Sequence, residues 1–191
     1  MELDLALDAA GVDLGVGDPA DLLDPTLWDS TLRTWLDHVR GDADLSCPVV
    51  VRRAEEISLG LRFTDDTVIR ELNGTWRQRQ EPTDVLSFAA LEDAPDWLES
   101  SSVELGDIVI SLDTARRQAQ EHQHSLQKEL QWLASHGLLH LLGWDHPDED
   151  SLAAMLECQD RLLSTIGPAD GGNVRSHGSE SDPSDARGDA H

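Results

Sequence analysis

Three histidines, His136, His140 and His146, lie close together in an otherwise apolar segment. Residues four apart on a helix share one face, so the imidazoles of His136 and His140 can converge on one ion. Gly143 follows the last apolar residue of the pattern, where helices commonly end in a left-handed glycine, and the chain can then return with His146. Three imidazoles leave one position of a tetrahedral zinc ion open, as in catalytic zinc sites. The spacing therefore predicts one catalytic zinc ion (Zn²⁺) per chain.

The alternative is that packing alone places these histidines. Three desolvated imidazoles would then need three separate hydrogen-bond partners, whereas one metal ion satisfies them together. We therefore favour the metal. The earlier histidines His38, His122 and His124 we interpret as surface residues.

A peptidase is the first hydrolase to consider, because the spacing HxxxHxxGxxH equals that of the metzincin proteases. Those enzymes carry a glutamate directly after the first histidine, and this glutamate acts as the general base. Here that position is Gly137, which has no side chain. A peptidase of this type would lack its general base. The chain therefore shares the ligand spacing of the metzincins but not the residue that their peptide hydrolysis needs.

Three blocks of the sequence resemble the YbeY family of bacterial zinc-dependent endoribonucleases, also called rRNA maturation factors. The family signature HGxLHLxGxDH is matched at every fixed position over residues 136–146. A second block, LNxxxR followed by PTDVLSF, stands at residues 72–77 and 82–88, and a third, LGDI, at 105–108. The resemblance spans roughly residues 57–166. It departs from the common pattern at Arg79, Gln80 and Ala89, where the family commonly has lysine, aspartate and proline.

The resemblance implies hydrolysis of phosphodiesters in single-stranded RNA, within late small-subunit rRNA maturation and ribosome biogenesis. It also implies a functional role for Arg77, whose planar guanidinium can donate two hydrogen bonds to a phosphate. The alternative for Arg77 is that it caps a helix C-terminus, where a cation is favourable. Two roles stay open for Asp84 and Ser87: hydrogen bonds to local backbone at a turn, or a place near the metal that the resemblance implies. Asp107 and Asp145 are candidates for orienting the ligand histidines, although a turn role competes for Asp145.

Two further classes of function stay open beside the endoribonuclease. One is a metal-dependent hydrolase of another substrate, such as a peptide. The other is a non-catalytic ribosome-assembly factor that binds ribosomal proteins or the small subunit. The formal net charge of −24 favours a basic protein partner over bare RNA, because phosphate binding needs lysine and arginine.

The composition predicts a cytoplasmic protein. Hydrophobic residues make up 39% of the chain, but no run is long enough for a transmembrane helix. The N-terminus lacks the basic and apolar regions of a secretory signal. Cys47 and Cys158 form no CxxC pair, so we expect two ordinary thiols in a reducing compartment.

The elements that must position the histidines follow from hydrophobic periodicity. Alternation predicts strands at 2–7 and 57–63, and the segments 84–89 and 104–111 are interpreted as two more strands. Helical spacing predicts about five helices. They begin at Pro25, after a cap at Thr64, at Asp113 (ending at 122), after a cap at Ser125 (continuing to Leu142) and at Pro147. In the second of them, Val68, Leu72 and Trp76 share one face. This order favours an α+β fold in which a small mixed sheet packs against the helices. We expect one domain over residues 1–166, and disorder over 167–191, where almost nothing is apolar.

Overall fold

A computed structural model describes residues 1–91 and 100–167 of the 191-residue chain. The tail that we expect to be disordered therefore lies almost entirely outside the described residues. Within the described part, no helix is both long and apolar enough to cross a membrane. The extent of the single domain stays a prediction.

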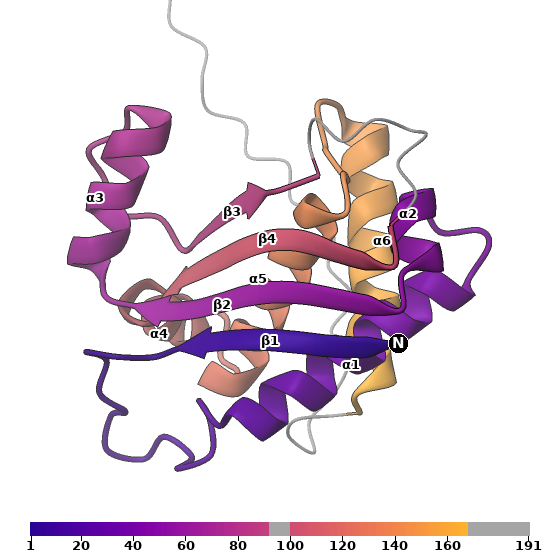
Figure 1. Cartoon of the computed structure of the whole chain (residues 1–191). Helices are drawn as coiled ribbons and strands as arrows, with labels where there is room; N and C mark the ends of the chain where they lie inside the picture. The colour runs from indigo at the N-terminus through magenta and orange to yellow at the C-terminus, as the bar shows by residue number, and fades with distance from the viewer. Residues whose placement is uncertain (92–99, 168–191) are drawn as a thin grey trace, which may run out of the picture.

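A four-stranded mixed sheet forms the centre of the fold, which confirms the predicted α+β class (Figure 1). Its order is β1–β2–β4–β3; β1 pairs with β2 and β2 with β4 in parallel, and β3 pairs with β4 antiparallel. The strands are β1 (Glu2–Asp8), β2 (Glu56–Thr64), β3 (Val85–Ala89) and β4 (Ser102–Ser111). All four lie close to the predicted ranges.

A bulge in β4 decides which of its side chains face the core. Glu104 pairs with Ser58, but the next pair is Gly106 with Leu59, so Leu105 is an extra residue. Gly106 has a φ of +115°, a conformation that glycine adopts without steric cost. The extra residue reverses the alternation, so Leu105 and Ile108 are both fully buried.

The described residues contain six helices where about five were expected. They are α1 (Pro25–Gly41), α2 (Val49–Arg53), α3 (Asp66–Arg77), α4 (Leu112–Glu121), α5 (Leu126–Leu141) and α6 (Glu149–Thr165). The five-residue α2 was missed because it is too short to show a helical period. Ser125 caps α5 as predicted. The cap of α3 is Asp65 rather than Thr64, and that of α6 is Asp148, one residue after Pro147.

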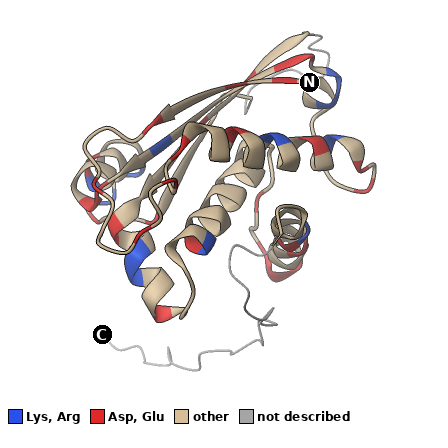
Figure 2. Ribbon diagram, turned by 90° about the horizontal axis from the view of Figure 1, so that it is seen from below, with Lys and Arg blue, Asp and Glu red and all other residues tan. Residues whose placement is uncertain are grey.

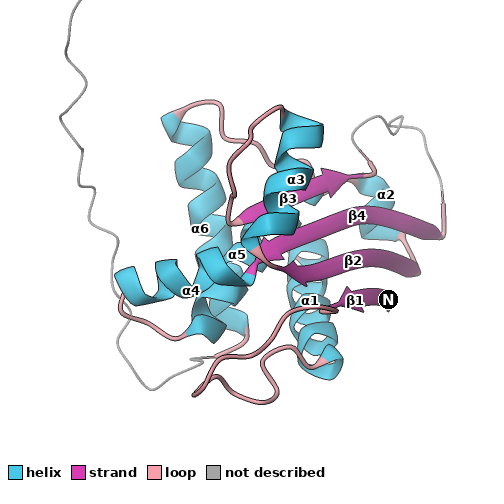
Figure 3. Cartoon of the chain, turned by 90° about the vertical axis from the view of Figure 1, so that its left-hand side faces the viewer, coloured by secondary structure: helices cyan, strands magenta, loops and turns pink. Residues whose placement is uncertain are grey.

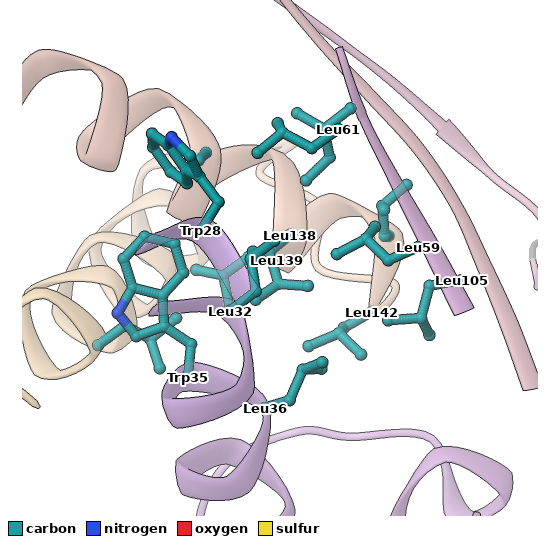
Figure 4. Close-up of a cluster of buried hydrophobic side chains, with 14 of the residues drawn as sticks. Trp28, Leu32, Trp35, Leu36, Leu59, Leu61, Leu105, Leu138, Leu139 and Leu142 are labelled. Carbon is teal, nitrogen blue, oxygen red and sulfur yellow. The ribbon is translucent and has the colours of Figure 1, made fainter. Parts of the chain in front are cut away.

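Most of the helices cover one face of the sheet, as the edge view in Figure 2 shows. The main core lies between this face and helices α1, α5 and α6, and it includes Trp28, Leu32, Trp35, Leu36, Leu59, Leu61, Leu105, Leu138, Leu139 and Leu142 (Figure 4). Helix α5 contacts β3, β4, α4 and α6. The helix that carries His136 and His140 is thus held on several sides.

Helix α3 lies apart from this core, beside β3 (Figures 1 and 3). Its Ile69 packs in a second, smaller cluster with Leu86 and Val109. The predicted buried face of α3 is wrong in part: Val68 and Leu72 are only half-buried, and Trp76 is 67% exposed. In the last turn of α3, the ring of Trp76 meets Phe88 of β3 edge-on at 5.8 Å but stays largely exposed.

Gly137 lets α5 approach the sheet closely. A Cβ at this position would lie 2.8 Å from Cγ2 of Ile108 and 3.2 Å from Oγ of Ser87. Neither neighbour can move freely, because Ile108 is fully buried in the middle of β4 and Ser87 is in β3. Position 137 therefore faces the sheet.

We expect Gly137→Ala to destabilise the fold by about 1–3 kcal/mol, the usual cost of overpacking a core. The measurement is the free energy of unfolding in urea. Gly41→Ala is the matched control, since nothing lies within 4 Å of a Cβ there. An unchanged free energy of unfolding for Gly137→Ala would show that α5 can shift without loss.

Candidate metal centre

The three histidines come from one helix and the turn that follows it. His136 and His140 lie on α5, which ends at Leu141. Gly143 has a φ of +86°, as predicted for a glycine that ends a helix, and the backbone N–H of Trp144 returns to the carbonyl of Leu139 at 3.0 Å. The indole of Trp144 donates to the carbonyl of Ser46 at 2.9 Å. This bond ties the turn that carries His146 to a distant part of the chain.

The imidazoles converge on one point. Nε2 of His140 lies 3.1 Å from Nε2 of His136, and one ligand nitrogen from each of the three rings lies within 4.8 Å of the others. In tetrahedral zinc with Zn–N bonds of 2.0–2.1 Å, ligand nitrogens are about 3.3 Å apart. The donor set and its spacing therefore fit a zinc ion.

Burial keeps two of these histidines in the form that binds metal. The pKa of His136 is lowered from its ordinary value, mainly by desolvation and then by the neighbouring charge of His140. The pKa of His140 is also lowered, mainly by desolvation and then by His146. A neutral imidazole is the ligand, so a lowered pKa means that fewer protons must be displaced when metal binds.

Because both pKa values are lowered, we expect His136 and His140 of the metal-free protein to titrate below pH 6.5, the ordinary value for histidine. NMR titration of the imidazole Cε1–H signals measures this. Midpoints at or above 6.5 would contradict the desolvated geometry.

Gln159 supports His136 from α6, a role that the sequence did not reveal. The side chain of Gln159 is fully buried, and its amide Nε2 donates to the carbonyl of Trp132 at 2.9 Å. This bond fixes the amide. Among the described residues, neither Oε1 of Gln159 nor Nδ1 of His136 has a hydrogen-bond partner. Desolvation lowers the pKa of His136, and the nearby side chain of Gln159 partly opposes that shift. An acceptor at Nδ1 would direct the Nε2 lone pair to the metal.

Arg77 lies in the last turn of α3, close enough to His140 for its charge to act on that ring. Its positive charge lowers the pKa of His140, although the two residues are far apart in the sequence. The side chain is exposed and has no hydrogen bond or ion pair within the described residues. The end of α3 is capped instead by backbone, since the N–H of Gln78 bonds the carbonyl of Asn73. The guanidinium is therefore available to a ligand.

Asp84 directly precedes β3, and Ser87 lies in β3 with its Oγ 3.2 Å from the position of a Cβ on Gly137. One carboxylate oxygen of Asp84 accepts the N–H of Val85 at 2.7 Å, and the other accepts from Nε2 of Gln118 at 2.9 Å. The charge of Asp84 raises the pKa of His136, so it lies near the centre. Asp84 thus bonds local backbone and Gln118, and its charge reaches His136.

Two of the sequence-based expectations need correction. Asp107 does not orient a ligand histidine, because it projects from the other face of the sheet and fills the space above Gly60. The β4 bulge is the reason, since it turns Ile108 toward α5. His124 is not a surface residue, because its side chain is only 22% exposed. Asp145 accepts the N–H of its neighbour His146 at 2.8 Å, as a turn residue would.

Comparisons with known proteins place this site in context. A family model described as Endoribonuclease YbeY matches residues 27–167. A curated relative of that name from Synechococcus sp. (strain CC9605) is 66% identical over 85% of this chain and 98% of its own length. Another, from Parasynechococcus marenigrum (strain WH8102), is 62% identical over 92% of this chain and 91% of its own. The solution structure of TM1509 from Thermotoga maritima has a similar fold, with a TM-score of 0.52 and 23% identity over 86% of this chain and 88% of the other.

Proposed function

Because this chain belongs to the endoribonuclease YbeY family, we propose that it is a zinc-dependent endoribonuclease that cleaves single-stranded RNA during rRNA maturation. The observation that carries this proposal is the convergence of three imidazoles within reach of the charge of Arg77, whose guanidinium has no hydrogen bond or ion pair among the described residues. This pairing of groups suits a phosphodiester, which presents oxygens to a metal and to arginine together.

The geometry supports the following roles for the chain's own residues. His136, His140 and His146 would hold the zinc ion, which when bound supplies Lewis-acid chemistry and activates water. Arg77 would donate two parallel hydrogen bonds to the phosphate and offset the charge that grows there during reaction. Gln159 would hold the ring of His136, and Trp132, stacked on it at 5.5 Å and 6°, limits its rotation.

A metzincin-like peptidase is less well supported. The general base of such an enzyme would come from position 137, where the glycine faces Ile108 and Ser87 rather than the metal centre. No glutamate could fit there without displacing α5 from the sheet.

The distribution of charge bears on the partners of the protein. Acidic residues lie on strands, helices and loops alike, and basic residues are fewer (Figure 2). Such a surface offers few phosphate contacts away from the centre and suits basic proteins. We propose that the enzyme works in the cytoplasm on rRNA, with ribosomal proteins of the small subunit as neighbours.

The test is cleavage by the purified full-length protein, as prepared, after chelation and after zinc is restored. The substrates are an unstructured RNA, a duplex RNA and an unfolded protein. We expect cleavage of the unstructured RNA only, lost with the chelator and restored by zinc. Cleavage of the protein substrate would favour the peptidase. No cleavage under any condition would favour the assembly factor.

A further inference from the structure

A second cluster of metal-binding side chains lies where α4 turns into α5. His122 and His124 come from the turn, and Glu129 comes from the first turns of α5. Oε2 of Glu129 lies 3.2 Å from Nδ1 of His122 and 3.0 Å from Nε2 of His124. All three ligand atoms lie within 4.8 Å of one another. Both imidazoles thus direct a nitrogen at the same carboxylate oxygen.

The contacts of His124 show why this oxygen needs a cation. Nδ1 of His124 faces the backbone carbonyl of Ser125 at 3.1 Å. A carbonyl can only accept, so the proton of a neutral ring resides on Nδ1. Nε2 then presents a lone pair to the carboxylate of Glu129 at 3.0 Å. Two acceptors at this distance repel each other unless a proton or a metal ion lies between them.

The surroundings favour a metal ion over a proton. The carboxylate is almost fully buried, with a side chain 3% exposed, and an unpaired charge there is costly. A proton on His124 satisfies that ring's contact and leaves the N–H of His122 to donate to the same oxygen, whereas one metal ion binds Glu129 and both imidazoles together. A ligand histidine whose other ring nitrogen donates to a backbone carbonyl is the usual arrangement in metal sites. His122 is 58% exposed, which gives an ion a path from solvent.

We propose that His122, His124 and Glu129 form a second metal site, which takes a divalent transition-metal ion such as Zn²⁺ and fastens α4 to α5. Two imidazoles and one carboxylate are a donor set that zinc binds, with water completing the coordination. The site is distinct from the first. Glu129 and His136 are seven residues apart on α5, which is about 10 Å at a rise of 1.5 Å per residue.

The experiment counts metal ions in the full-length protein. Metal-free protein is titrated with Zn²⁺ by calorimetry and with Co²⁺ by visible absorption, which reports tetrahedral nitrogen and oxygen ligands. We expect two equivalents for the wild type and one for His122→Ala. His140→Ala should also bind one, and the double variant none. Affinity at the second site should fall by at least about 100-fold in His122→Ala, because even groups that only orient ligands contribute 10–100-fold.

The controls keep a folding defect apart from a lost ligand. His122 is exposed, so its substitution leaves the core intact, whereas Glu129→Gln changes a buried group. Glu121→Gln removes an exposed carboxylate next to the cluster and should still bind two equivalents. One equivalent for both the wild type and His122→Ala would overturn the proposal and leave a protonated His124 paired with Glu129. The titration measures metal binding and not RNA cleavage. Finding either one or two metal ions per chain therefore does not affect the proposed endoribonuclease function.

Discussion

His140→Ala is expected to lose zinc binding at the three-histidine centre, and with it RNA cleavage, while it keeps its fold. Nε2 of His140 lies 3.1 Å from Nε2 of His136, so this ring supplies one of the three converging nitrogens. Two imidazoles hold zinc far more weakly than three, and we expect the affinity at this site to fall by more than about 100-fold. Cleavage should fall to the rate without metal. Calorimetric zinc titration and gel assays of RNA cleavage measure the two effects.

His38→Asn is the matched control for His140→Ala, because His38 lies on α1, outside both histidine clusters. It should keep its metal content and its cleavage rate. If His140→Ala bound zinc as tightly as the wild type, the candidate centre would be wrong. If it lost zinc but cleaved RNA normally, the zinc would be structural and the reaction would take place elsewhere.

Arg77→Ala is expected to keep the fold and the zinc but to cleave RNA about 10²–10³-fold more slowly. This is the usual loss in kcat when one group that stabilises transition-state charge is removed. Arg77 makes no hydrogen bond or ion pair within the described residues, so its loss leaves no protein partner unsatisfied. Arg77→Lys should also be impaired, because a point charge cannot form two parallel hydrogen bonds. Single-turnover cleavage with saturating protein isolates the chemical step.

Arg70→Ala provides the control on the same helix, since Arg70 is also exposed but lies two turns before Arg77. It should cleave at close to the wild-type rate. The competing interpretation is that Arg77 only stabilises the C-terminus of α3. Arg77→Ala would then cleave normally and lose about 0.3–1 kcal/mol of stability.

Local patterns in the sequence predicted the elements well. The alternation of Ile57, Leu59, Leu61 and Phe63 placed β2, because period two on a half-buried surface is characteristic of strands. Ser125 was identified as the cap of α5 because its side chain can accept from a backbone N–H three residues later. The helical spacing of His136 and His140 predicted that their imidazoles converge, and the glycine that ends the helix predicted the return of the chain, because both are local properties.

Other outcomes depended on contacts between distant residues. Nothing in the sequence places Arg77 beside His140, because helical periodicity shows which face of α3 is apolar but not which element lies beyond its last turn. The same holds for Gln159, which reaches His136 from α6 and looks like any polar helix residue.

The remaining corrections concern Asp107 and His124, and each has its own structural cause. The extra residue at Leu105 reverses the alternation of β4 and turns Asp107 away from α5, and a bulge has no reliable signal in the sequence. His124 lies in the turn between α4 and α5, where its side chain is only 22% exposed and its Nε2 lies 3.0 Å from the carboxylate of Glu129. Spacing along the chain thus determined the ligands that one helix and its turn can supply. The residues that surround these ligands, such as Arg77 and Gln159, come from other helices. Their positions depend on tertiary packing, which spacing along the chain does not show.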